Sequence, residues 1–175
     1  MYSLKILITF FSNTGNTEKV ANSMKTGLTD YDLNLIPAND VDPTTLGSYD
    51  IVFLGSGVYA SRIGNSILTM IKKAVPELPA KFVYFCTHAS LKLYQEPFKQ
   101  ITDIVKKHNC EIIGEFDCVG ENLGIPLDTQ LAMLERLPED QREKAKKDRE
   151  KIKGRPNELD LENAKNFETS LVKNL

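Results

Sequence analysis

The chain has few cysteines. Its three cysteines, Cys86, Cys110 and Cys118, are odd in number and have no C-x-x-C spacing. This pattern argues against a disulfide framework and against a zinc site, and it is typical of a reducing compartment. We therefore expect no metal site and a cytoplasmic location. Cys86 and Cys118 fall within predicted strands, where a buried thiol behaves as a small hydrophobic side chain.

Long apolar runs and an excess of one charge are also missing. No stretch approaches the length of a membrane span, and the first residues enter a strand pattern at once, so we expect neither a span nor a signal peptide. The net charge is −2 with 26% charged residues, which offers no basic face for nucleic acid. Composition leaves protein partners and the oligomeric state open.

The apolar residues that are present suffice for one core. With 175 residues, of which 41% are hydrophobic, the chain fits a single domain spanning 1–175. Continuous apolar runs predict strands covered on both faces. These runs lie at 4–11, 33–36, 51–54, 82–86 and 112–116.

Between the apolar runs lie segments whose apolar residues recur at helical spacing. Apolar stripes at this spacing begin at Val20, Ile63, Phe98 and Ala164. Parallel strands need such crossovers, so the alternation predicts a doubly wound α/β fold with a five-stranded parallel sheet. Asn157 is the expected N-cap of the last helix, with Glu158 and Asp160 in its first turn.

The segment 121–153 does not fit this alternation. It begins with a loop that contains glycine and proline at 122–126 and continues as a charged tract at 135–153. The tract mixes both signs, and Glu143 stands four residues before Lys147, so we expect a solvated helix with internal ion pairs. A surface helix decorating the last crossover is favoured over a dedicated docking arm.

A hydroxyl-rich turn at 12–17 joins the first strand directly to the first helix. The turn reads Ser-Asn-Thr-Gly-Asn-Thr and contains no Lys or Arg. Backbone N–H groups at a helix N-terminus favour an anion, so this junction predicts a phosphate site. The Walker pattern and the G-x-G-x-x-G fingerprint are both missing, which favours a mononucleotide.

Two further loops follow strands that end at the same edge of the sheet, where ligands of open parallel sheets bind. The loop at 55–60 offers two glycines, which let backbone approach a flat ring, and Tyr59, which offers an aromatic face. The loop at 87–90 contains His88. Tyr59 is either a ring-stacking group, which its setting favours, or a partly buried packing residue.

The chain resembles the flavodoxin family. The resemblance lies in 10–17, in 55–59, in 116–120 and in 154–164, and it covers nearly the whole chain. It implies a sheet of order 2-1-3-4-5 and FMN as cofactor. It also implies that the phosphate is bound by Ser12, Asn13, Thr14, Gly15, Asn16 and Thr17, that the isoalloxazine is lined by Ser56, Gly57, Val58 and Tyr59, and that its other wall is formed by Thr87, His88 and Ala89.

Three functions agree with this resemblance. We favour an electron carrier that serves a reductase and an acceptor protein, in which the carbonyl of Gly57 or a neighbour accepts a hydrogen bond from flavin N5–H. The alternatives are an FMN oxidoreductase acting on a small aromatic substrate such as a quinone, with 121–153 shaping its pocket, and a cofactor-free binding scaffold. No catalytic residue is assigned, and whether the protein is an enzyme stays open.

Further features of the sequence bear on these alternatives. His88 is either a hydrogen-bonding partner of flavin or substrate, or a loop histidine bonded to backbone; we weigh the two equally. The nearly neutral charge and the lack of an aromatic in the third loop before Tyr94 are less typical of the family. His108 is expected only to end the third helix.

Overall fold

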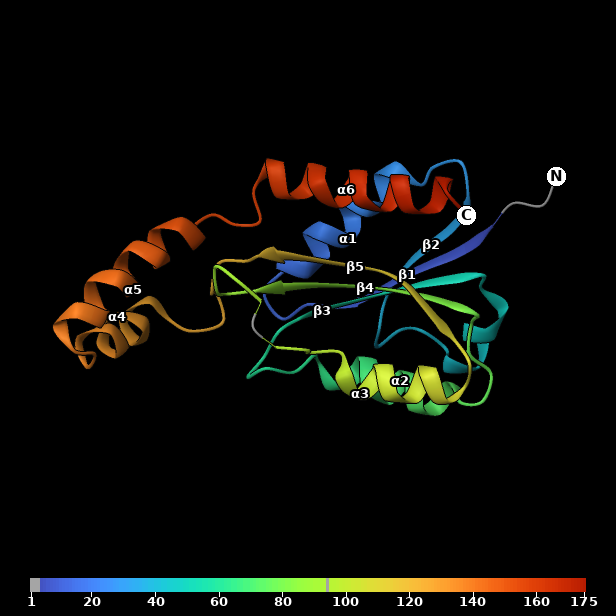
Figure 1. The fold of residues 1–175 in the computed structure, drawn as a ribbon, viewed down its shortest axis with the longest axis horizontal. Helices are drawn as coiled ribbons and strands as arrows, with labels where there is room; N and C mark the ends of the chain where they lie inside the picture. Colours follow the sequence, from blue (N-terminus) through green and yellow to red (C-terminus); the bar gives the residue numbers. More distant parts are fainter. Residues whose placement is uncertain (1–3, 94) are drawn as a thin grey trace.

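The computed structural model describes residues 4–93 and 95–175. Its centre is a parallel sheet with the order β2-β1-β3-β4-β5, as the resemblance implied (Figure 1). The strands are β1 (Lys5–Phe11), β2 (Asp32–Pro37), β3 (Ile51–Gly57), β4 (Lys81–His88) and β5 (Glu111–Val119). The three inner strands β1, β3 and β4 are buried along most of their length, whereas the two edge strands are partly exposed.

Helices cover both faces of the sheet. On one face lie α1 (Asn16–Gly27) and α6 (Glu158–Lys173), and on the other lie α2 (Asn65–Ala74) and α3 (Lys99–Lys107) (Figure 1). Alternate residues of a strand point to opposite faces. Accordingly, Ile6 and Ile8 pack with the α1 and α6 side chains, while Leu7 packs with those of α2 and α3. A short 3-10 helix, η1 (Pro43–Ser48), precedes β3.

The segment 121–153 contains two helices instead of one. They are α4 (Leu127–Glu135) and α5 (Glu139–Ile152), and they project beyond the sheet as a hairpin (Figure 1). The expectation of a solvated helix is confirmed for α5, which buries no residue. The expected pairing of Glu143 with Lys147 is wrong, because Glu143 pairs with Lys146, at 3.2 Å between Oε1 and Nζ. Helix α4 was not predicted.

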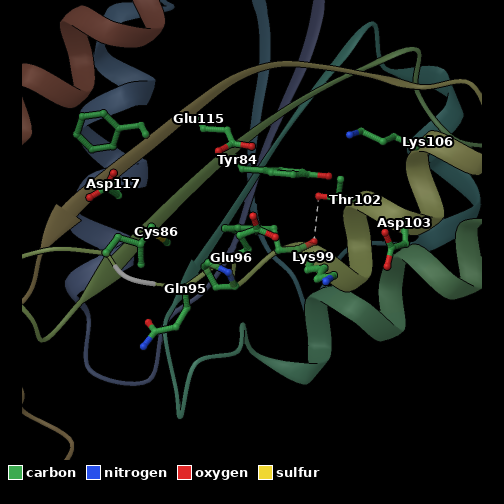
Figure 2. Close-up of a pocket in the computed structure, with 14 residues that line it drawn as sticks. Tyr84, Cys86, Gln95, Glu96, Lys99, Thr102, Asp103, Lys106, Glu115 and Asp117 are labelled. Atoms are coloured by element: carbon green, nitrogen blue, oxygen red, sulfur yellow. Dashed lines mark hydrogen bonds between the residues drawn. The ribbon is translucent and has the colours of Figure 1, made fainter.

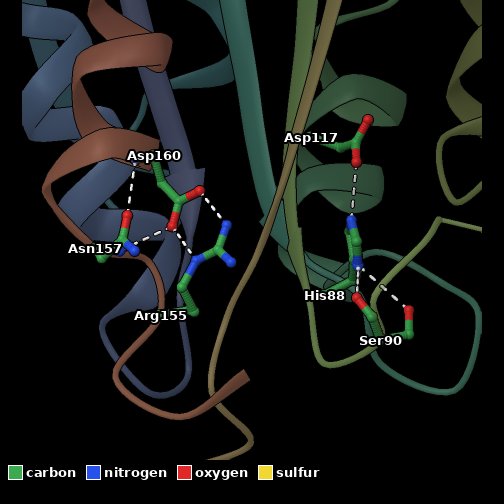
Figure 3. A network of polar contacts seen from close by, with 6 residues as sticks. All are labelled: His88, Ser90, Asp117, Arg155, Asn157 and Asp160. Atoms are coloured by element: carbon green, nitrogen blue, oxygen red, sulfur yellow. Dashed lines mark hydrogen bonds and ion pairs between the residues drawn. The ribbon is translucent and has the colours of Figure 1, made fainter. Parts of the chain in front are cut away.

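The last helix begins as the sequence predicts. The Asn157 side chain accepts a hydrogen bond from the N–H of Asp160, and the Asp160 carboxylate accepts one from the N–H of Asn157, which forms a capping box. Arg155 also pairs with Asp160 through two contacts (Figure 3). These bonds fix the turn between α5 and α6. Within the residues described, none of the helices is both long and apolar enough to cross a membrane.

Candidate functional site

A pocket of about 340 Å³ opens where the loops after β1, β3, β4 and β5 meet. This is the carboxyl edge of the sheet, where the strand order reverses between β1 and β3. The structure brings ten of the thirteen predicted residues into its lining: Asn13, Thr14, Asn16, Thr17, Gly57, Val58, Tyr59, Thr87, His88 and Ala89. Ser12, Gly15 and Ser56 are not among the lining residues.

The turn after β1 presents an open helix N-terminus. Gly15 is the N-cap residue of α1, with φ at 88°, and no side chain caps the helix there. The N–H groups of the first helical turn have no intrahelical acceptor, so this end favours an anion. Ser12 shapes the turn from outside the pocket, because its hydroxyl accepts a hydrogen bond from the Gly15 N–H at 3.1 Å.

Asn16 is the most informative side chain of this turn. It is 5% exposed, and its Nδ2 donates to the carbonyl oxygen of Glu121 at 2.8 Å. Its Oδ1 is buried and has no hydrogen-bond partner among the described residues. An unpaired buried acceptor is costly, so Asn16 Oδ1 suits a ligand that supplies a hydroxyl or N–H donor.

The loop after β3 is held by Ser56. Its hydroxyl donates to the carbonyl of Gly57 at 2.7 Å and accepts from the N–H of Gly64 at 2.9 Å. The N–H of Val58 donates to the carbonyl of Thr87 at 2.9 Å, which joins this loop to β4. Ser56 is fully buried, so it supports the pocket from behind instead of lining it.

We expect Ser56→Ala to lower the free energy of unfolding by about 1–2 kcal/mol, because the buried N–H of Gly64 loses its acceptor. Ser66→Ala is the matched control: the hydroxyl of Ser66 is buried without a partner among the described residues, so its removal should cost little. Urea unfolding of both variants measures the difference. Equal destabilisation would contradict the role given to Ser56.

Tyr59 closes one side of the pocket. Its hydroxyl accepts a hydrogen bond from the N–H of Asn13 at 3.0 Å, and burial raises the pKa of this hydroxyl. A Cβ on Gly57 would lie 2.5 Å from that oxygen, so the tyrosine rests directly on the glycine. The ring also meets Phe11 edge to face, with centroids 5.8 Å apart. Tyr59 thus makes packing contacts while it lines the pocket.

The turn that follows Tyr59 has an unusual backbone. Tyr59 and Arg62 exchange two backbone hydrogen bonds of 2.7 and 3.0 Å. Between them, Ala60 and Ser61 have φ values of 46° and 68°. Non-glycine residues seldom adopt this left-handed conformation. The tight turn fixes the position of Tyr59 over the pocket, and nothing in the sequence indicated it.

His88 ends β4 and is 5% exposed. Its Nε2 lies 2.9 Å from a carboxylate oxygen of Asp117, and its Nδ1 lies 2.9 Å from the carbonyl oxygen of Ser90 (Figure 3). Each ring nitrogen thus lies against one hydrogen-bond acceptor of the protein. The two ring nitrogens are therefore engaged within the protein.

Thr87 completes this wall of the pocket. Its hydroxyl lies 2.9 Å from the hydroxyl of Thr17, and both residues are buried. One hydroxyl donates to the other, which leaves the second proton free for another acceptor. The pair therefore connects β4 to the first turn of α1. Tyr94 lies outside the described residues.

The loop after β5 was not among the predicted cofactor-binding residues, although the oxidoreductase alternative gave 121–153 a role in shaping the pocket. It contributes six lining residues that were not predicted: Gly120, Glu121, Asn122, Leu123, Gly124 and Ile125. The turn after β3 contributes a seventh, Ala60. The loop lies close to the phosphate turn, since a Cβ on Gly124 would lie 3.7 Å from Thr14 Cγ2. The rule that selected the other loops, their place after a parallel strand, also applies to this one.

A second hollow, of about 410 Å³, lies beside β4, β5 and α3 (Figure 2). Tyr84 forms part of it and stacks on Phe98, with ring centroids 4.5 Å apart. The Tyr84 hydroxyl has no hydrogen-bond partner among the described residues, and burial raises its pKa to about 12. The predicted site residues do not line this hollow, whose acidic residues are Glu96, Asp103, Glu115 and Asp117.

The cysteines lie where the sequence placed them. Cys86 and Cys118 are buried in β4 and β5, and all three cysteines are free thiols. Burial raises the pKa of Cys118 to about 12, and it also raises that of Cys86, so these thiols stay protonated and unreactive. In the part of the chain that is described, His, Cys, Asp and Glu form no group of three that could hold a metal ion.

The sheet order and the pocket at its switch point define a doubly wound α/β protein with a ligand site at the carboxyl edge. The sequence model of the flavodoxin domain family matches residues 7–169. The chain therefore belongs to the flavodoxin domain family.

Relatives and solved structures agree with this assignment. An uncharacterized protein of Methanocaldococcus jannaschii is 29% identical over 173 residues, which is 98% of this chain and 100% of that protein. A probable flavodoxin of Bacillus subtilis is 43% identical over 54 residues, which is 30% of this chain and 34% of that protein. The structure of oxidised flavodoxin 1 from Bacillus cereus matches 98% of this chain and 99% of its own, with a TM-score of 0.65 and 14% identity. At that identity the likeness concerns the fold alone.

Proposed function

We propose that this protein binds FMN and carries electrons between a reductase and an acceptor protein. The observation that carries the proposal is the uncapped N-terminus of α1, which opens into the pocket at the switch between β1 and β3. Asn13, Thr14, Asn16 and Thr17 would hold the phosphate and the adjoining chain, with Ser12 and Gly15 shaping the turn. Gly57, Val58 and Tyr59 on one side, and Thr87, His88 and Ala89 on the other, would enclose the ring.

The residues fit this cofactor. Among the described residues, no Lys or Arg lines the pocket, so the anion meets hydroxyls, an amide and backbone N–H groups. The buried Oδ1 of Asn16 is suited to accept a hydrogen bond from a hydroxyl of the ribityl chain. FMN, when bound, supplies the electron-accepting ring, and the protein positions that ring and adjusts its electrostatic surroundings.

The hydrogen bonds around Gly57 refine the hypothesis about flavin N5–H. The Gly57 carbonyl already accepts a bond from Ser56, and the Val58 N–H of the same peptide donates to Thr87. Rotating this peptide toward the ring therefore breaks two hydrogen bonds. We propose that Ser56 holds the peptide in its present orientation until a ligand offers the carbonyl a better donor.

A second candidate function is an FMN oxidoreductase that acts on a small aromatic substrate. The observation that favours it is a groove beside the pocket, which shares Ala89, Glu121, Asn122 and Ile125 with the pocket.

We also propose a single domain with the hairpin as its extension. A cytoplasmic location is supported by the three free thiols.

One experiment separates these functions. The visible spectrum of the purified protein is recorded, FMN is added, and the flavin is reduced stepwise. An electron carrier is expected to bind FMN and to accumulate a one-electron-reduced form. A single two-electron step, with turnover of a quinone by a nicotinamide donor, would support the oxidoreductase instead. A colourless protein that does not take up FMN would reject both and leave a binding scaffold.

A further inference from the structure

Exposed apolar side chains lie on α4 and on the loops beside the α4–α5 hairpin. No residue of either helix is buried. Leu127, Leu131 and Met133 of α4 are 44–54% exposed, and Leu91 and Leu123 of the neighbouring loops are exposed as well. Of these, Leu91 and Met133 line one groove, and exposed apolar side chains that share a groove mark a binding surface. Leu123 lines the candidate FMN pocket, and Leu127 and Leu131 line neither cavity.

A groove of about 670 Å³ runs between this hairpin and the loops 89–92 and 121–125. This volume lies within the usual range for small-molecule sites, roughly 300–1,000 Å³. Apolar and charged side chains alternate in its lining, and the apolar ones are Leu91, Ile125, Met133, Leu134, Ala145 and Ile152 together with Ala89. The space suits a flat apolar molecule of a few rings.

The charges of the groove favour an anion. Lys92, Lys144 and Lys153 line it, and none of the three forms an ion pair with any described residue. Arg149 also lines it, and its NH1 has only a distant partner, at 3.7 Å, in Glu150. These cations surround an apolar space and lack close counter-ions of their own.

The two carboxylates of the groove offset only part of this positive charge, because four basic side chains line it. Glu121 accepts a hydrogen bond from the Gly154 N–H at 2.8 Å, and Asp148 lies 3.9 Å from Lys151, which does not line the groove. The lining therefore carries four basic and two acidic side chains, and both acids have partners. The net positive charge selects a ligand with at least one anionic group.

The groove adjoins the candidate FMN pocket through a shared wall, which is held by Gln130. Its Nε2 donates to the carbonyls of Asn122 and Ile125, at 2.7 Å each, and its Oε1 lies 3.4 Å from Nε of Arg149. Asn122 and Ile125 line both cavities. A molecule in the groove therefore lies next to the pocket.

We propose that this groove binds a small, flat, apolar molecule that carries a carboxylate or a similar anionic group. The apolar rings lie against Met133, Leu134 and Ile152, and the anionic group faces Lys144 and Lys153. The redox role of this molecule, as the substrate or acceptor of a flavin beside it, rests on the proposed function. Its binding does not, because the groove is built without FMN.

The test compares two probes of the same shape, anthraquinone-2-carboxylate and its neutral amide, by isothermal titration calorimetry on the full chain. The carboxylate is expected to bind about tenfold more tightly than the amide, since a charge-assisted contact is stronger than a neutral one. The double variant Lys144→Gln/Lys153→Gln is expected to lose this preference and to bind the amide as before.

Lys146→Gln/Lys147→Gln is the matched control. It removes the same number of positive charges, from α5, whereas Lys153 follows the end of that helix; neither Lys146 nor Lys147 lines the groove. Equal binding of the two probes, or equal weakening by both double variants, would overturn the proposal. So would binding of an acidic peptide in place of either small probe. Circular dichroism confirms that the variants keep their helices.

The titrations are repeated with and without saturating FMN. We expect the carboxylate to bind in both conditions, because the two cavities are distinct. If the apparent Kd of the probe rises without limit as FMN is added, the two molecules compete for one site and the inference is wrong. If the protein takes up no FMN but still prefers the carboxylate through Lys144 and Lys153, the proposed function fails and this inference stands.

Discussion

Replacing both Thr14 and Thr17 with valine is expected to abolish retention of FMN while the sheet and helices stay intact. Both threonines line the pocket at the N-terminus of α1. A hydrogen bond to a charged group contributes roughly 1.5–3 kcal/mol. The loss of two such donors should therefore weaken FMN binding by about 100-fold or more. Fluorescence quenching of FMN during titration measures the affinity.

Thr26→Val is the control for this experiment. Thr26 lies in the same helix, and its hydroxyl donates to the carbonyl of Ser23 at 2.7 Å, away from the pocket. Thr14→Val alone is also needed, because Thr17→Val leaves the buried hydroxyl of Thr87 without its partner. If the double variant binds FMN as tightly as the original protein, the phosphate site assigned to this turn is wrong.

Replacing Glu168 with glutamine is expected to stabilise the protein more at pH 8 than at pH 5, by roughly 2–3 kcal/mol. Glu168 lies in α6, is fully buried, and has one carboxylate oxygen without a partner among the described residues. Burial raises its pKa to about 7, although the Thr169 hydroxyl and two lysines act in the opposite direction. The folded protein therefore keeps this carboxyl protonated in moderately acidic solution.

The direction of the pH effect follows from the two states. In the unfolded chain the carboxyl ionises near its usual pKa of about 4.3. Between that value and about pH 7 the folded state holds a proton that the unfolded state has released. The stabilisation that the protonated Glu168 carboxyl gives the folded original protein is thus fully present below its unfolded-state pKa. It is lost as the pH rises through its folded-state pKa.

Urea unfolding between pH 5 and pH 8 measures this difference. Glu162→Gln, on the exposed side of α6, serves as the control and should show no such trend. The two histidines are common to all variants, so their titration cancels in the comparison. A stability difference between Glu168→Gln and the original protein that does not change with pH would contradict the assignment.

The parts of the fold that depend on residues close together in the sequence could be predicted from it. The strand at 4–11, the hydroxyl-rich turn and the stripe of Val20 and Met24 are contiguous, and the capping box at Asn157 is complete within four residues. Local patterns of this kind carry their own structural signal.

The hairpin shows where such signals were present but not used. Leu127, Leu131 and Leu134 stand at helical spacing, yet no separate helix was predicted between the loop at 122–126 and the charged tract at 135–153. Pro138 then separates α4 from α5, whose charged sequence was recognised as a solvated helix. An apolar stripe only three residues long, without a cap, gives a weak helix signal.

The contacts that complete the site could not be predicted. The amide of Asn16 meets the carbonyl of Glu121, 105 residues away in the sequence. The contact of His88 with Asp117 depends on the register of β4 and β5, which contains an irregularity at Phe82/Val83. Such pairs arise from the packing of whole elements, which a single sequence does not specify.

The strip 122–125 forms a partition between two cavities, and Gln130 fastens it to the hairpin. If an occupant on one side displaces this partition, the affinity on the other side changes. Thermodynamic linkage requires the factor to be the same in both directions. Loosening the partition, for example by Gln130→Ala, would then make the two ligands independent of each other.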